Sequence, residues 1–280
     1  LTTNDVYYRR QLSMHMLNIH QLQNDVVYYC YDETVARKGC NDVCSLLQHY
    51  CDNFLGENVR YLDVFMDSCA GQNKNFTVIR FLHYLCTLKQ RFNSVTVHFP
   101  VRGHSYMEAD KDMGNINQKV SLELPDDWIN HIAGSRFKPS PFKVVKCDQS
   151  MFSNWREYFP TIGYRAKAQF ETRPIKEMKF TSQHAQTFQF REHYNGAWTS
   201  PLLTQRGRNV TAEGTGSELK SLYSSLLPIT AAKYQDLQVL KKFCAPEAHI
   251  FFQVFHTCRK RDNKCAFFLI SEHYCIYSRT

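Results

Sequence analysis

The chain has 280 residues, of which 43% are hydrophobic, including 20 Phe and 16 Tyr. This composition supports a packed core and excludes a chain that is disordered throughout. No apolar run approaches the roughly 20 residues of a membrane-spanning helix, so we expect no membrane as a partner. Many of the 11 cysteines lie in apolar segments, which favours the reduced thiols of a nuclear or cytoplasmic protein over a disulfide framework.

Charge is distributed unevenly along the chain. Residues 1–130 carry 12 Lys and Arg against 15 Asp and Glu, whereas residues 131–280 carry 22 against 11. An acidic first part followed by a basic second part suits an acidic catalytic centre with an attached surface for polyanions, DNA above all. A soluble basic domain without such a partner fits the same numbers.

In chain order, a predicted hairpin is followed by alternating helices and strands. The turn residues Gln23-Asn-Asp25 separate the two hairpin strands, and Asn41 is a suitable N-cap for the first helix. The predicted strands are 6–22, 26–31, 59–66 and 94–99, and the predicted helices are 41–55, 73–90 and part of 108–123. This order implies a mixed sheet covered by helices in a first domain, residues 1–124.

The pattern of predicted elements changes after Pro125. Residues 125–255 are predicted to form a basic α+β extension, with a short helix at 151–159, two strands within 170–190 and a helix at 231–244. Between the two strands and the last helix, we expect a hairpin that packs Trp198 on the core. Its aromatic residues could also stack on a base of a nucleic acid. Residues 256–280 show no clear period, and we expect a tail that need not belong to the domain.

The strongest candidate site lies in residues 61–75. A mostly apolar strand stops at Asp67, and a turn that contains Gly71 leads into a helix. Open α/β sheets place their chemistry at this end of a central strand. If a second acid lies close by, the pair can hold Mg²⁺ or Mn²⁺ and cut or join phosphodiesters. The candidates for that second acid are Glu108 and Asp110, at the start of a later helix.

Each candidate contact to nucleic acid also has an ordinary structural explanation. Gln72, Asn73 and Lys74 open the helix after Asp67 and are candidates to contact a phosphate, but helix capping explains Asn73 equally well. Arg102 and His104 follow the 94–99 strand, where His104 can equally be a turn residue. Acids at a helix start, including those proposed as ligands, also complement the helix dipole.

Several motifs in one order resemble an uncharacterised domain family of transposon-derived proteins that occurs in many copies in arthropod genomes. The likeness covers about residues 1–255. The motifs are Leu1-Thr-Thr-Asn4, Tyr8-Arg-Arg-Gln-Leu12, Asn18-Ile-His20, Asp32-Glu33, Asp67-Ser-Cys-Ala-Gly-Gln-Asn-Lys-Asn75, Gly103-His104 with Glu108-Ala-Asp110, Lys138-Pro-Ser-Pro-Phe-Lys143, Tyr194-Asn-Gly-Ala-Trp198 and Lys233-Tyr-Gln-Asp-Leu-Gln-Val-Leu-Lys-Lys-Phe-Cys244.

The resemblance implies a ribonuclease H-like domain of the transposase or integrase type. In that fold, carboxylates on the first strand, the fourth strand and a later helix hold two metal ions. Here Asp67 and Asp110 would be metal ligands, with Glu108 as third acid and Asp42 as a possible helper. The strand with the first acid would precede Leu1 and is expected to be missing, and two carboxylates bind Mg²⁺ weakly.

Two functions therefore stay open. The first is metal-dependent cleavage or strand transfer on DNA, an activity that can be absent from this fragment alone. The second is a non-catalytic module that binds nucleic acid or protein and retains the fold. Either function is compatible with an oligomer.

Overall fold

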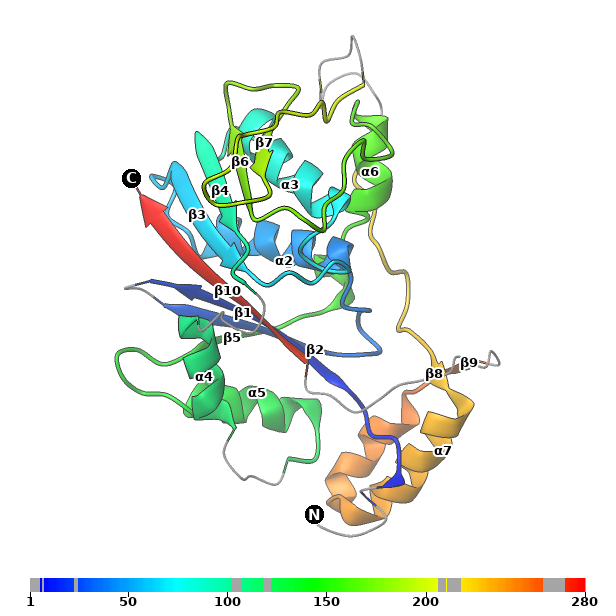
Figure 1. Cartoon of the computed structure of the whole chain (residues 1–280). Helices are drawn as coiled ribbons and strands as arrows, with labels where there is room; N and C mark the ends of the chain where they lie inside the picture. The colour runs from blue at the N-terminus through cyan, green and yellow to red at the C-terminus, as the bar shows by residue number, and fades with distance from the viewer. Residues whose placement is uncertain are drawn as a thin grey trace.

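A computed structural model describes residues 6, 8–22, 25–101, 107–117, 122–205, 210, 218–258 and 270–279. Its centre is an eight-stranded mixed sheet with the strand order β5-β2-β1-β10-β3-β4-β6-β7 (Figure 1). The strands of this sheet are β1 (Met14–Gln21), β2 (Val26–Asp32), β3 (Tyr61–Met66), β4 (Ser94–His98), β5 (Lys143–Lys146), β6 (Glu177–Thr181), β7 (Gln189–Arg191) and β10 (Ile270–Arg279). The predicted mixed α/β class is thus confirmed, and the finer ribonuclease H-like class stays a prediction.

Six described α-helices accompany the sheet. They are α2 (Cys40–Asn53), α3 (Phe76–Thr87), α4 (Glu108–Ile116), α5 (Pro125–Gly134), α6 (Trp155–Thr161) and α7 (Ala231–Leu240). Three short 3-10 helices, η1 (Gln149–Met151), η2 (Lys241–Phe243) and η3 (Pro246–Gln253), and a two-stranded sheet of β8 (Ile229–Thr230) and β9 (Thr257–Cys258) complete the described elements.

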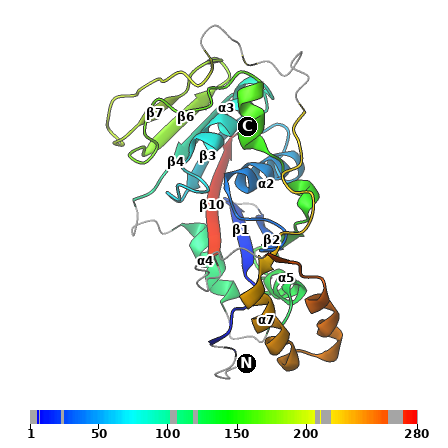
Figure 2. The same ribbon diagram turned by 90° about the vertical axis from the view of Figure 1, so that its right-hand side faces the viewer.

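The two faces of the sheet carry separate cores because side chains alternate along each strand. On β1, Leu17 and Ile19 belong to the main core, which also contains residues of α2, α3 and α6. Met14 and Met16 point the other way, into a smaller core with α4 and α5. Figure 1 shows α2 and α3 above, and α4 and α5 below, the strands β1, β2 and β10. Strands β4, β6 and β7 extend beyond α4 (Figure 2).

The predicted hairpin is present, since β1 and β2 pair antiparallel. Strand β3 pairs parallel with β4, as expected for two strands joined by a helix. Strands β5, β6 and β7 come from residues after 125 and join the same sheet. The sheet therefore continues across the boundary expected at residue 124.

The C-terminal residues differ from the expectation of a separate tail. Strand β10 lies in the middle of the sheet, parallel to β1 and antiparallel to β3. Ile276 of this strand is buried in the main core. The sequence gives no local sign of this placement because a strand in the interior of a sheet needs no alternation between polar and apolar residues.

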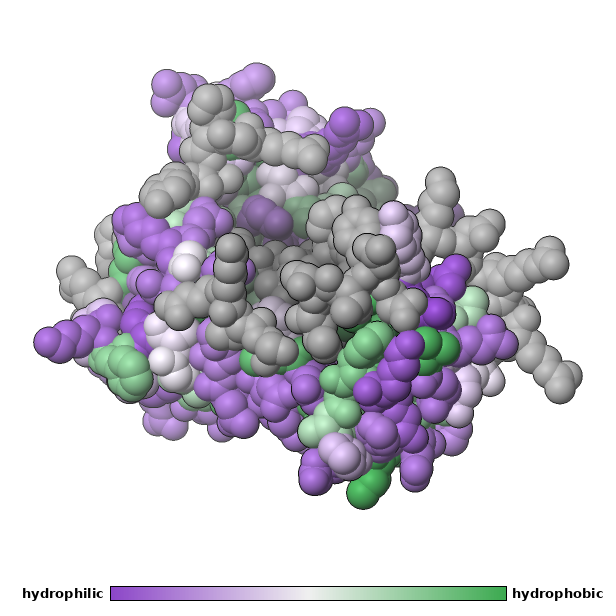
Figure 3. Space-filling model, turned by 90° about the horizontal axis from the view of Figure 1, so that it is seen from below, coloured by the Kyte–Doolittle hydropathy of each residue, from purple (hydrophilic) through white to green (hydrophobic). Residues whose placement is uncertain are grey.

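A small third core lies beside the sheet. It contains Ile229, Leu237, Leu240 and Phe252, and partly buried residues of the N-terminal segment pack against it. Asp236 on α7 accepts hydrogen bonds from Arg10, which ties the same two segments together. Seen from below, most of the described surface is hydrophilic, with apolar residues in small patches (Figure 3).

Three local predictions are corrected by the structure. Helix α2 begins at Cys40, and Asp42 caps it by accepting a hydrogen bond from the backbone N–H of Gly39, so Asn41 is not its N-cap. Helix α3 begins at Phe76 rather than at residue 73, because Asn75 is its N-cap. Trp198 is 38% exposed rather than packed on the core, and the Arg191 guanidinium lies over its ring.

None of the described helices is both long enough and apolar enough to cross a bilayer. Nine of the 11 cysteines lie in the described part of the chain, and no disulfide joins them there.

Candidate functional site

The turn after β3 is organised by Asp67. Met66 is buried in the main core, so Asp67 follows on the opposite face of the sheet. Its Oδ1 accepts hydrogen bonds from the backbone N–H of Cys69, at 3.2 Å, and from the Asn73 side chain. No described residue donates a hydrogen bond to Oδ2. One carboxylate oxygen of Asp67 therefore shapes the turn.

Gln72, Asn73 and Lys74, the predicted phosphate contacts, hold this turn in place. Gln72 donates to the carbonyl of Lys38 at 3.2 Å. Lys74 is buried, and its ammonium donates to the carbonyl of Arg173 at 2.8 Å and lies over the Phe99 ring. Burial, with Lys176 nearby, lowers the pKa of Lys74 to about 8. Lys74 thus joins the turn to the segment around Arg173 rather than facing solvent.

The two acids at the start of α4 have different surroundings. Glu108 is exposed and forms an ion pair with Lys111 at 2.8 Å. The hydrogen bond from Lys111 holds the pKa of Glu108 below its ordinary value. Asp110 accepts a hydrogen bond from the backbone N–H of Met107 at 2.8 Å, which caps the helix. Both acids therefore also have the ordinary helix-start roles that the sequence leaves open.

Strand register brings Asp67 and the start of α4 to the same face of the sheet. Met66 pairs with Tyr274 and Phe65 with Cys275 in the β3–β10 ladder. The Cys275 thiol is buried, which raises its pKa, and the backbone N–H groups of Glu108 and Ala109 lower it. The first turn of α4 therefore lies over β10, the strand next to the end of β3. The turn of Asp67 and the first turn of α4 thus lie on one face of the sheet, beside two adjacent strands.

The described residues nevertheless form no complete cation centre. Among them, no group of three or more His, Cys, Asp or Glu side chains is placed to hold a metal ion. Asp42, the possible helper, is buried at the start of α2 and accepts hydrogen bonds from Gly39 N–H and the Tyr223 hydroxyl. Burial raises the pKa of Asp42. Arg102 and His104 lie outside the described residues.

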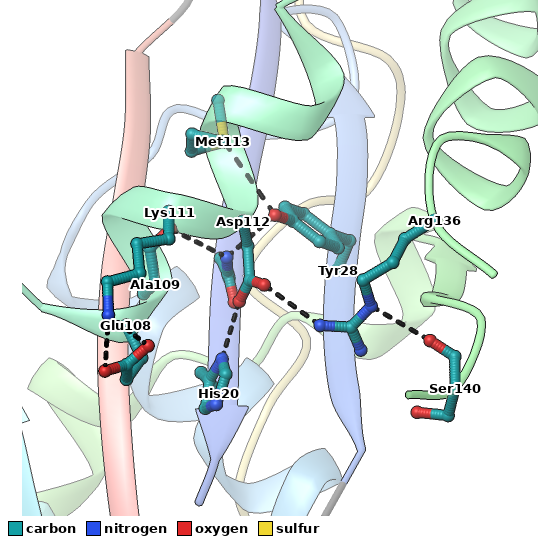
Figure 4. A network of polar contacts seen from close by, with 10 residues as sticks. His20, Tyr28, Glu108, Ala109, Lys111, Asp112, Met113, Arg136 and Ser140 are labelled. Carbon is teal, nitrogen blue, oxygen red and sulfur yellow. Dashed lines mark hydrogen bonds and ion pairs between the residues drawn. The ribbon is translucent and has the colours of Figure 1, made fainter. Parts of the chain in front are cut away.

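A buried polar network under α4 is the feature that sequence reasoning did not single out (Figure 4). Asp112 accepts a hydrogen bond from Arg136 Nη1 at 3.0 Å, and its other oxygen lies 2.6 Å from His20 Nδ1. Asn18 donates to the Tyr28 hydroxyl at 2.8 Å. Asn18 of β1 also donates to the Ala109 carbonyl and the Tyr28 hydroxyl of β2 to the Met113 sulfur, so the network attaches α4 to both strands. In the sequence, Asp112 lies four residues after Glu108 and so on the same helix face. Nothing in the sequence points to Arg136 or His20 as its partners.

A basic segment lies beside the turn. Residues 165–179 contain five Lys and Arg against two Asp and Glu. Of these acids, Glu177 pairs with Arg191 and with His98 at 3.8 Å. The five basic side chains form no salt bridge within the described part of the chain. They are Arg165, Lys167, Arg173, Lys176 and Lys179.

Comparison with known proteins gives one match. Residues 7–124 are similar to a family described as a domain of unknown function (DUF7869). No curated protein and no solved structure matches the chain. The matched range covers β1 to α4, which includes Asp67 and the start of α4 but not the basic segment.

Proposed function

We propose that this chain is a nucleic-acid-binding α/β domain whose ligand lies across the turn between β3 and α3. The observation that carries the proposal is the basic segment 165–179, with five cationic side chains that no described acid neutralises. The hydrogen bond from Lys74 to the Arg173 carbonyl fixes this segment next to the turn. Unneutralised Lys and Arg side chains attract phosphates and release the counterions that surround them.

The order of the first elements adds support. A hairpin, α2, β3, α3, β4 and α4 follow one another as expected for a ribonuclease H-like domain. In such a domain, nucleic acid would meet the sheet at the end of β3. Within this expectation, DNA binding at the turn is the part that contacts of the described residues support, through the bond from Lys74 to the Arg173 carbonyl.

A divalent cation fits this site only in part. Asp67 Oδ2 offers one ligand position, whereas Mg²⁺ is usually held by one or two carboxylates together with waters and substrate phosphates. Glu108 already pairs with Lys111. We therefore derive no catalytic step from these residues.

Binding is tested by fluorescence anisotropy of a labelled single-stranded oligonucleotide at several salt concentrations. If the five basic residues each neutralise a phosphate, the plot of log affinity against log salt has a slope of about −3.5. Replacing Lys167, Arg173 and Lys176 by Ala makes the slope less steep by about 2. An affinity that does not change with salt, or a variant that binds like the wild type, rejects the proposal.

Metal-dependent cleavage or strand transfer is the second candidate function. It is favoured by the position of Asp67 and Asp110 on one face of the sheet, at neighbouring strands. Nicking of supercoiled plasmid in the presence of Mn²⁺ tests it, with Asp67→Ala as the variant and Asp63→Ala, on the same face of β3, as the control. Cleavage that requires Asp67 but not Asp63 supports it, and cleavage that both variants retain counts against it.

A further inference from the structure

A cavity of about 540 Å³ lies on the α2 side of the same turn. Its walls include Arg37, Asp42, Gly71, Arg156 and Tyr223, together with the segment 224–228. Gly71 belongs to the turn itself, and the neighbouring Gln72 donates to the Lys38 carbonyl at 3.2 Å. The cavity therefore adjoins the turn that carries Asp67.

The two arginines at this cavity have no carboxylate partner among the described residues. Arg37 and Arg156 are exposed, and neither forms a salt bridge with a described carboxylate. The closest described partner of the Arg156 guanidinium is the Cys40 sulfur, at 3.4 Å. Two arginines without acid partners at the rim of one cavity favour an anionic ligand.

A third guanidinium lies behind Arg156. Arg80 is buried, and within the described part of the chain it donates to the backbone carbonyls of Phe76 and Arg165. Burial, with the charge of Arg156 nearby, lowers the pKa of Arg80 to about 10. Arg80 therefore adds a second positive charge close to Arg156.

Asp42 is the one acid among the described residues of the wall. Its carboxylate is already bonded to Gly39 N–H, at 2.9 Å, and to the Tyr223 hydroxyl, at 3.0 Å. It also caps α2, so the helix start is occupied by a protein carboxylate. The two arginines, and not the helix start, are therefore the groups that a ligand would meet.

We propose that the cavity binds a phosphodiester group of a polynucleotide, with Arg37 and Arg156 as its donors. Guanidinium groups match phosphate oxygens with paired hydrogen bonds, which an ammonium cannot form. This inference rests on the proposed function and deepens it. A strand bound at the turn would meet both the basic segment 165–179 and this cavity, since each adjoins the turn.

The test compares the double variant Arg37→Ala/Arg156→Ala with Lys89→Ala/Lys146→Ala, which removes the same charge from exposed positions elsewhere. With an oligonucleotide of about 12 nucleotides, the first variant should bind about tenfold more weakly, with a salt slope less steep by about 1. The control should bind within about twofold of the wild type. Arg37→Lys/Arg156→Lys, which keeps the charge, should recover the salt slope but only part of the affinity.

Three outcomes overturn the inference. If the cavity variant binds like the wild type while the basic-segment variant does not, the cavity is not a phosphate site and the proposed function stands. If both variants bind like the wild type, both proposals fail. If inorganic phosphate alone binds the wild type as tightly as the oligonucleotide, and the cavity variant loses it, the site belongs to a free phosphate and not to a polynucleotide.

Discussion

At the scale of residues, burial distinguishes two ion pairs whose acids lie on the same helix, α4. Asp112 and Arg136 have side chains that are 5% and 10% exposed, whereas Glu108 and Lys111 are 44% and 51% exposed. An exposed pair contributes little because water and salt screen it. A buried pair leaves an uncompensated charge in the interior when one partner is removed. The two pairs should therefore respond very differently to mutation.

We expect Asp112→Ala to lower the free energy of unfolding by about 3–5 kcal/mol, because Arg136 stays buried without its carboxylate. Glu108→Ala, on the same helix, should lower it by less than about 1 kcal/mol. Urea unfolding followed by circular dichroism measures both. Equal effects of the two substitutions would mean that the network under α4 does not hold the helix on the sheet.

A buried histidine gives the fold a dependence on pH. His83 on α3 lies 2.8 Å from the Tyr164 hydroxyl and 3.0 Å from the His184 carbonyl. Burial lowers the pKa of His83 to about 4. Between the unfolded pKa of about 6.5 and this folded value, the unfolded chain binds a proton that the folded chain does not, so stability falls as the pH falls.

The contribution of His83 to this loss should be about 2 kcal/mol between pH 7 and pH 5. His83→Gln, which cannot titrate, should lose correspondingly less stability over the same interval. Urea unfolding of both proteins at the two pH values gives the difference. A variant with the same pH dependence as the wild type would show that His83 is not the titrating group.

The sequence could predict Asp67 but not the network around Asp112. Asp67 follows an apolar strand and precedes a turn with Gly71, so its place at the end of β3 follows from local pattern. Asp112, His20 and Arg136 come from three distant segments. Their meeting depends on how α4 and α5 pack on the sheet, for which a single sequence carries no local signal.

At the scale of elements, helix α3 shows how one cap fixes the start of a helix next to the site. The Asn75 side chain accepts hydrogen bonds from the backbone N–H groups of Thr77, at 3.0 Å, and Val78, at 3.1 Å. Satisfying these amides is the usual role of an N-cap. Asn75 therefore ends the turn of Asp67 and begins α3.

Asn75→Ala should destabilise the protein by about 1 kcal/mol, and Asn75→Asp should restore most of that loss because aspartate is also a good cap. Thermal unfolding of the three proteins tests this expectation. If Asp does not recover stability, the loss comes from the second bond of Asn75, to the Gln72 carbonyl, and not from the cap.

Element prediction succeeded where the pattern was strong. The β-branched and aromatic run at 26–31 and the run at 94–99 correspond to β2 and β4. It failed at the start of α2, where Gly39 occupies the cap position and Asp42 supplies the side chain. Asn41 has a capping side chain, but in the fold it accepts a hydrogen bond from the backbone of Arg156, so tertiary contacts overrode its preference.

At the scale of the whole molecule, β10 joins the two parts of the sheet. It lies between β1 and β3, which do not pair with each other. Strands β5, β2 and β1 are on one side of it, and β3, β4, β6 and β7 are on the other. Pairing between segments more than 200 residues apart leaves no local trace in a sequence, which is why residues 256–280 were expected to be a tail.

Ile276→Pro should destabilise the protein severely, because proline cannot donate a hydrogen bond within an interior strand and Ile276 is buried. Ile276→Val, which keeps the strand and loses one methylene, should cost about 1 kcal/mol. Thermal unfolding of the two variants measures the difference in their stability. A proline variant as stable as the valine variant would show that β10 is not an interior strand of the sheet.

The most direct test of nucleic-acid binding at the turn is hydrogen exchange of the backbone amides, measured with and without a saturating oligonucleotide. If nucleic acid binds at the turn, exchange becomes slower in residues 67–75 and 165–179 and changes little in α5 and β5 at the other end of the sheet. Slower exchange confined to α5 and β5, or no change anywhere, would contradict it.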